Sequence, residues 1–134
     1  MLWDLLAERT PEQSISHKVM PTWQQHCGFV DSRPYEAWYL VWDETREALS
    51  PRGIAVGAVY LSRQREIGVG ILRTERGQGH AQWAIGELMR LHPGRFLANI
   101  SPANEPSARL FGRLGFSLIQ HTYEGPSGNP LAAA

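Results

Sequence analysis

The chain has few residues that could form covalent or metal cross-links. Cys27 is its only cysteine, so no intrachain disulfide and no cluster of cysteine ligands can form. A free thiol without a disulfide framework is typical of a reducing compartment. His17 and His26 have no second ligand one helical turn away, so we expect no metal site.

The chain also lacks an excess of charge of either sign. Thirteen Lys and Arg residues balance thirteen Asp and Glu residues. A protein that holds a nucleic-acid backbone usually carries a basic excess, so nucleic acid is not the expected partner. No apolar run approaches the roughly 18 residues of a membrane helix, and Met1–Arg9 does not resemble a signal peptide. We therefore expect a soluble, cytoplasmic protein with no membrane partner.

The length of 134 residues suits one domain, and 43% hydrophobic against 19% charged residues argues against disorder. No internal repeat is present. Residues 124–134 are rich in glycine, proline and alanine and contain almost nothing to bury. We expect a single domain over residues 1–123 and a loose C-terminal tail over 124–134.

The N-terminal quarter shows two helical patterns. The first carries leucines at helical spacing, Leu2, Leu5 and Leu6. In the second, Thr22 is a suitable cap for a helix over 23–32, which Pro34 prevents from continuing. Phe29 and Val30 are expected to face the core.

Three apolar runs then predict strands, at residues 35–43, 53–61 and 66–72. Residues 62–65 read as the turn of a hairpin between the second and third. Because the runs are almost continuously apolar, we expect the strands to be covered on both faces. The glycines within them mark bulges or close approaches of another group: Gly57, Gly68 and Gly70.

The second half of the chain alternates helices with short strands. An amphipathic helix is indicated by the stripe Ala81, Ala84, Ile85 and Leu88. A strand is expected over 96–100, and Asn104 caps a further helix that ends at Gly115 in the left-handed conformation, with Phe116 as its hydrophobic partner. The segment 117–123 is expected to close the sheet. The order of elements predicts an α/β domain with a mixed sheet.

A basic, glycine-bearing loop joins the third strand to the amphipathic helix. Its sequence is Arg76-Gly77-Gln78-Gly79-His80-Ala81. Backbone NH groups at such a helix N-terminus are suited to a phosphate or pyrophosphate. No Lys-Ser/Thr pair follows, so it is not a Walker loop, and Gln82 breaks the dinucleotide fingerprint.

Two signatures together resemble the GNAT superfamily of acyl-CoA N-acyltransferases. Arg76-x-x-Gly79-x-Ala81 after a bulged strand is similar to its motif A. A second match follows at the expected distance, with Asn104, Ala108, Phe111 and Leu114-Gly115-Phe116. The matches cover roughly residues 54–123. They imply a GNAT-like mixed, mostly antiparallel central sheet that splays at the cofactor cleft and is flanked by helices. The family's first edge strand is expected to be absent, because Met1–Leu6 looks helical.

The resemblance implies acetyl-CoA as cosubstrate and assigns residues to it. The pantetheine arm would pair with the strand backbone at Ile71, Leu72 and Arg73. The pyrophosphate would be held by the amides of Arg76, Gly77, Gln78, Gly79, His80 and Ala81. Asn104 either touches the cofactor arm or serves only as a helix cap. Phe111 is similarly placed against the cofactor.

Acetyl transfer requires a neutral amine, and at a pKa near 10.4 only about one alkyl amine in 2,500 is neutral at pH 7. A positioned base therefore matters, and the resemblance places Glu66 in that role, acting through water. The alternative for Glu66 is an exposed carboxylate paired with Arg63 or Arg65.

Many relatives use a tyrosine as general acid where this chain has Phe111, which cannot donate a proton. Tyr123 is the expected substitute, with His121, Ser101 or water as alternatives. A thiol with a pKa near 8.5 is also a tolerable leaving group without an acid.

The acceptor is not readable from the sequence. Trp38, Tyr39 and Trp42 either line its pocket or belong to the core, and residues 63–65 either bind an anionic acceptor or form a solvated turn. The favoured function is N-acetyl transfer to a primary amine of a small molecule, an aminosugar nucleotide or a peptide, by direct attack. The alternatives are a non-catalytic acyl-CoA sensor and an acetyltransferase acting on a modified nucleobase in DNA. A homodimer remains open.

Overall fold

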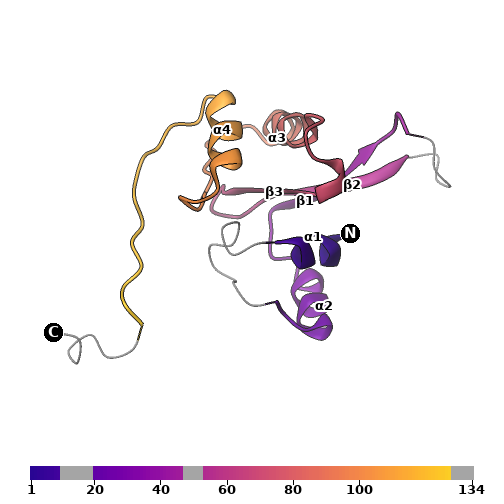
Figure 1. Cartoon of the computed structure of the whole chain (residues 1–134), viewed down its shortest axis with the longest axis horizontal. Helices are drawn as coiled ribbons and strands as arrows, with labels where there is room; N and C mark the ends of the chain where they lie inside the picture. Colours follow the sequence, from indigo (N-terminus) through magenta and orange to yellow (C-terminus); the bar gives the residue numbers. More distant parts are fainter. Residues whose placement is uncertain (10–19, 47–52, 128–134) are drawn as a thin grey trace.

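The computed structural model of the chain describes residues 1–9, 20–46 and 53–127. A small sheet lies between two helical layers, with α3 and α4 over one face and α1 and α2 below the other (Figure 1). The elements in chain order are α1 (Leu2–Glu8), α2 (Trp23–Asp31), β1 (Ala37–Asp43), β2 (Ile54–Leu61), β3 (Ile67–Ile71), the 3₁₀ turn η2 (Arg73–Glu75), α3 (His80–Leu91) and α4 (Glu105–Arg113). The first three of the five predicted strands and all four predicted helices are therefore confirmed. In the described part of the chain, no helix is long and apolar enough to cross a bilayer.

The sheet is antiparallel in the order β1-β2-β3. The expected hairpin joins β2 to β3, because the Ser62 NH donates to the Glu66 carbonyl across 2.9 Å. An irregularity lies between β1 and β2, where Val41 faces Gly57 but the next residue, Trp42, faces Ala55. The pairing of β3 with β2 is regular. The bulge expected in the strand that enters the loop thus belongs to the neighbouring strand pair.

The hydrophobic core lies between the sheet and α3. The stripe of α3 buries Ala84, Ile85 and Leu88 against Leu61 and Val56 of β2, as its period predicts. On the opposite face, α1 packs against the sheet and its Leu5 lies over Gly70. Both faces of the sheet are therefore covered.

The second helix begins as predicted but buries a different residue. Thr22 and Gln25 form a reciprocal capping box at its N-terminus. His26 is the buried residue of the helix, packed beside Trp3, whereas Phe29 is 44% exposed. The expectation that Phe29 faces the core was wrong, because the contact with α1 turns the His26 side of the helix inward.

The region after α3 forms less sheet than predicted. The segment 96–100 is tied to β3 by a single parallel bridge between Leu97 and Glu66. α4 ends as expected, with Gly115 at a φ of +90° and the Phe116 NH bonded to the Phe111 carbonyl. The prediction that 117–123 closes the sheet was wrong for the single chain. This segment forms no strand and runs away from the body (Figure 1).

Candidate functional site

The loop between β3 and α3 is shaped by two glycines. After η2, Gly77 and Gly79 have φ values of +80° and +81°, a region that other residues adopt only with strain. A Cβ atom added at either position would meet no atom within 4 Å, so the conformation and not the space calls for glycine. Gly79 is the N-cap of α3 and offers no side chain that could bond the first helical NH groups.

The backbone donors of this loop are left open. Within the described ranges, no protein acceptor reaches the NH groups of residues 77–82. They comprise the loop amides and the first turn of α3, where the helix dipole adds partial positive charge. Open NH groups with this local charge are suited to an oxyanion such as a phosphate.

A cluster of charged side chains packs beside the loop and links it to the end of β1. Glu75 of η2 is buried and pairs with Arg46 across 2.8 Å, and Arg46 also lies 3.6 Å from Asp43 at the end of β1. His80 points into the same cluster, with its Nε2 3.8 Å from the Asp43 carboxylate. A hydrogen bond from the Thr45 hydroxyl, followed by its backbone NH, His80 and Arg46, lowers the pKa of Asp43. The cluster fixes the start of α3 against the sheet.

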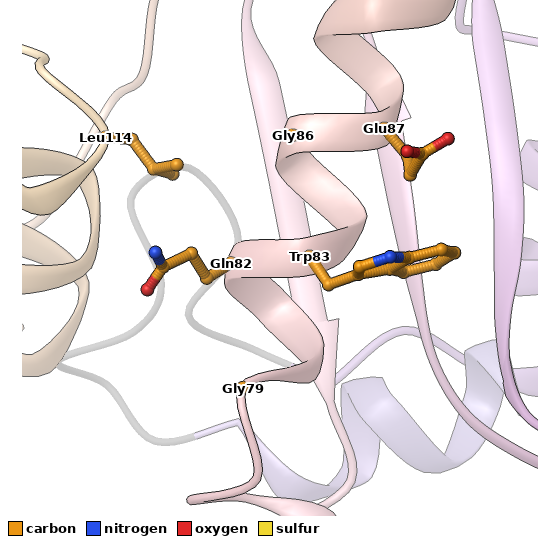
Figure 2. A pocket seen from close by; sticks show the side chains of 6 residues that line it. All are labelled: Gly79, Gln82, Trp83, Gly86, Glu87 and Leu114. Atoms are coloured by element: carbon orange, nitrogen blue, oxygen red, sulfur yellow. The ribbon is translucent and has the colours of Figure 1, made fainter. Parts of the chain in front are cut away.

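A hollow of about 440 Å³ lies along the outer side of α3. Gly79 and Gly86 leave the helix surface bare, while Gln82 and Leu114 point toward each other in the gap beside α4 (Figure 2). Trp83 and Glu87 stand on the other side of α3, and Trp83 is 62% exposed. Apart from Gly79, sequence reasoning missed the residues of this hollow. An exposed tryptophan on the polar side of an amphipathic helix was the signal that could have revealed it.

Two backbone groups at the end of β3 are already bonded to side chains. The Arg73 NH donates to the Glu8 carboxylate across 2.8 Å, and the Ile71 carbonyl accepts from Arg76 Nε across 3.1 Å. Leu72 instead donates from its NH to the Val56 carbonyl of β2. Thus Ile71 and Arg73 point their backbone groups away from β2, which is where a ligand arm could pair.

Glu66 stands at the opposite end of β3. Its carboxylate accepts a hydrogen bond of 2.7 Å from the Asn99 amide and forms no ion pair within the described residues. Arg65 turns away, donating to the His92 carbonyl across 2.6 Å and lying over the Phe96 ring. Neither Arg65 nor Arg63 therefore neutralises Glu66. Arg65 is not a free hairpin-tip cation, since it holds the segment after α3.

Two residues of the second signature, Asn104 and Phe111, have structural roles in the fold. The Asn104 side chain accepts from the Ser107 NH across 3.3 Å, so it is a helix cap. Phe111 is buried in the core against Phe116, with ring centroids 5.1 Å apart. Tyr123 is 87% exposed on the segment that leaves the body, so the structure does not bring it together with Glu66.

The aromatic residues of β1 divide between two surroundings. Trp38 packs edge-on against Tyr35, which stacks on Tyr60 with ring centroids 3.9 Å apart. Burial, and then Tyr60, raises the pKa of Tyr35. Tyr39 is 40% exposed and its hydroxyl lies 2.7 Å from His92 Nε2. Trp38 is thus part of a packed aromatic cluster, while Tyr39 borders the surface.

The fold of this chain is similar to the folds of two solved structures. The chain is similar to yncA from Salmonella typhimurium, provisionally assigned as an acetyltransferase and described with its cofactor acetyl-CoA. The TM-score is 0.61 and the identity 17%, over 87% of this chain and 69% of that one. It is also similar to a provisionally assigned GNAT-family acetyltransferase from Bordetella pertussis. There the TM-score is 0.60 and the identity 22%, over 91% of this chain and 80% of that one.

The chain has the GNAT acetyltransferase fold. No family model matches the sequence, and no curated protein matches it either. In this fold the glycine-bearing loop joins β3 to α3, and the second signature spans α4 and the turn that follows it. Among the described residues, no group of three or more His, Cys, Asp or Glu side chains could hold a metal ion.

Proposed function

We propose that this protein is an N-acetyltransferase that transfers the acetyl group of acetyl-CoA to a primary amine. The observation that carries the proposal is the row of open NH groups at residues 77–82, at the junction of β3 and α3 in a GNAT fold. A diphosphate bound there would accept several of these donors at once. The neighbour described with acetyl-CoA supports the same choice of cosubstrate.

The remaining parts of the cosubstrate follow from the direction of β3. A pantetheine arm leaving the loop would run along the strand past Ile71, and its thioester would arrive near the other end. From Ile71 to Glu66 the strand spans about 16 Å at ~3.3 Å per residue. Glu66 would therefore serve the reacting end while the loop would hold the phosphates.

Glu66 would act as the general base. Its carboxylate is bonded to a neutral amide and not to a cation, so it is free to take a proton from the acceptor ammonium through water. The amine nitrogen then attacks the thioester carbonyl carbon and a C–N bond forms. The nitrogen gives up its second proton to solvent, and the C–S bond breaks. CoA departs as a thiolate, which takes up a proton from solvent, and the product is an amide. Phe111, buried in the core, supplies no acid for this step.

Binding is tested by calorimetry with CoA and acetyl-CoA. Gly79→Ala should weaken binding about ten-fold or more, because a residue with a side chain at this φ costs about 1–2 kcal/mol and the loop relaxes away from the ligand. Gly112→Ala in α4 is the matched control, since its added Cβ also meets open space without a positive φ. Absence of any CoA binding by the wild-type protein would refute the proposal.

Catalysis is tested separately by release of free thiol from acetyl-CoA with a panel of amines. The panel contains small amines, aminosugar nucleotides and peptides with a free amino group. Acceleration over the uncatalysed reaction, lost in Glu66→Gln, is the expected result.

A second candidate is a non-catalytic acyl-CoA sensor. It is favoured by one observation: Phe111, at the position where the GNAT resemblance implies a general-acid tyrosine, is a buried residue that cannot donate a proton. A protein that binds CoA in the calorimeter but releases no thiol with any amine of the panel would have this function.

A further inference from the structure

The segment that follows α4 has no partner in the single chain. Residues 117–127 are all exposed, and within the described residues none of them makes a backbone hydrogen bond. Leu118, Ile119 and Tyr123 are 74%, 66% and 87% exposed. We call residues 117–123 the arm. Its sequence, Ser-Leu-Ile-Gln-His-Thr-Tyr, has the β-branched and aromatic residues of a strand and no proline.

The same chain also carries an open sheet edge. Leu97 directs both of its backbone groups toward the β3 side, accepting from the Ile67 NH across 2.7 Å and donating to the Arg65 carbonyl across 2.8 Å. In an extended segment the neighbouring residues point their groups the other way. In the described structure, Phe96 and residues 98–100 have no backbone hydrogen bond. Their side chains Phe96, Ala98 and Ile100 nevertheless pack on the core, so the edge is held in place.

We propose that two copies of this chain exchange their arms, each arm adding as a strand to the open 96–100 edge of the other copy. Strand addition satisfies an unpaired edge and an unpaired segment at the same time. Each copy has one arm and one open edge, so a two-fold symmetric dimer pairs both arms with both edges. Because the formal net charge of the chain is zero, no net charge repulsion opposes the association of two copies.

The direction of the arm favours a second copy over the chain's own edge. Phe116 is pinned to α4 by its NH bond to the Phe111 carbonyl and by packing of the two rings. From there the chain continues away from the sheet and from all helices (Figure 1). Pairing within one chain would require a reversal directly after Phe116, whereas pairing with a neighbour uses the arm as it stands.

The exchange would also support the proposed active site. Asn99, which bonds Glu66, belongs to the segment that the partner's arm would pair with. This consequence rests on the proposed function, but the exchange itself does not. The test therefore reads the oligomeric state and not the activity.

Sedimentation equilibrium of the full chain should give a mass of about 30 kDa, twice the 15.1 kDa of one chain. Ile119→Asp and Ile119→Pro should each give a monomer, the first by placing a charge in the new interface and the second by removing a backbone donor. Leu40→Asp is the matched control. Leu40 is 44% exposed on β1, at the opposite edge of the sheet, so this variant should remain a dimer.

Amide hydrogen exchange identifies the edge. Residues 96–100 and 117–123 should be protected in the wild-type dimer and exchange at least ten-fold faster in Ile119→Asp. A wild-type monomer with an unprotected arm, or a monomer whose arm is protected on its own edge, would overturn the proposal. So would a dimer that survives both Ile119 substitutions, since it would be held by another surface such as the outer edge of β1.

Discussion

The carboxylate of Glu8 accepts a hydrogen bond from the backbone NH of Arg73 across 2.8 Å, and the Arg73 guanidinium in turn donates to the Glu8 carbonyl across 3.2 Å. These two hydrogen bonds, which we call the latch, hold the end of α1 against the residues that follow β3. The Arg73 NH is one of the groups that the proposed pantetheine arm would use. The first helix and the cosubstrate would therefore compete for the same donor.

Removing this competitor should strengthen cosubstrate binding. We expect Glu8→Ala to lower the dissociation constant of CoA several-fold, in keeping with a net hydrogen bond of about 1 kcal/mol. Isothermal titration calorimetry checks the effect, with Asp31→Ala as the control because Asp31 is an exposed acid at the end of α2. Unchanged or weaker binding in Glu8→Ala would show that the latch supports the binding-competent structure.

The exposed Trp83 should hold the adenine end of the cosubstrate. Base–aromatic stacking contributes about 1–3 kcal/mol, so Trp83→Ala should weaken CoA binding roughly five-fold or more. Phosphopantetheine has no adenine, and its affinity should be the same for Trp83→Ala and the wild-type protein. An equal loss for both ligands would place the effect in the loop and not in a stacking contact. Trp83→Phe should retain most of the CoA affinity.

Much of this arrangement could be predicted from local sequence. The α3 stripe, the Thr22 cap and the left-handed Gly115 each depend on residues within a few positions of one another, and all three were found. Strand propensity is also local, and it marked residues 117–123 as a strand. Pairing, however, needs an available edge in reach, which no short pattern encodes.

The support of the loop was missed for a related reason. Glu75 was not singled out in the sequence, yet it is buried and pairs with Arg46, 29 residues earlier. The amide of His80 was assigned to the cofactor, but the place of its side chain, which faces Asp43, was not predicted. Burial of a charge depends on a partner brought by the fold, so these roles could not be derived from spacing.

Asp43 should make the stability of the protein depend on acidic pH. Its pKa is lowered in the folded state, first by the Thr45 hydroxyl and then by the Thr45 NH, His80 and Arg46. A lowered folded pKa means that the stabilisation is present above the unfolded value near 3.9 and is lost as the pH falls through the folded value. Asp43→Asn should therefore be less stable than the wild type at neutral pH, and the two should converge as the pH falls through the folded value.

Denaturant unfolding between pH 2 and pH 7 measures this difference. Glu105→Gln is the control, since Glu105 is 79% exposed at its side chain and pairs with the exposed Arg109 across 3.8 Å. Its stability should follow the wild-type curve throughout. A constant difference between Asp43→Asn and wild type at every pH would indicate a packing effect and not a linked ionisation.

Substitutions of Glu66 and Asn99 should distinguish the proton-transfer role of Glu66 from the positioning role of Asn99. If Glu66 takes the proton from the acceptor amine, Glu66→Gln should lower kcat by about 10²-fold or more at neutral pH and remove the acidic limb of the pH–rate profile, with little change in CoA affinity. Asn99→Ala leaves the carboxylate in place but removes its 2.7 Å hydrogen bond, so kcat should fall less and the acidic limb should persist at a shifted pH. Asn99→Gln, which keeps an amide donor, should recover part of the rate. A pH–rate profile that Glu66→Gln leaves unchanged would exclude this carboxylate as the base, and the proton would then have to leave through solvent alone.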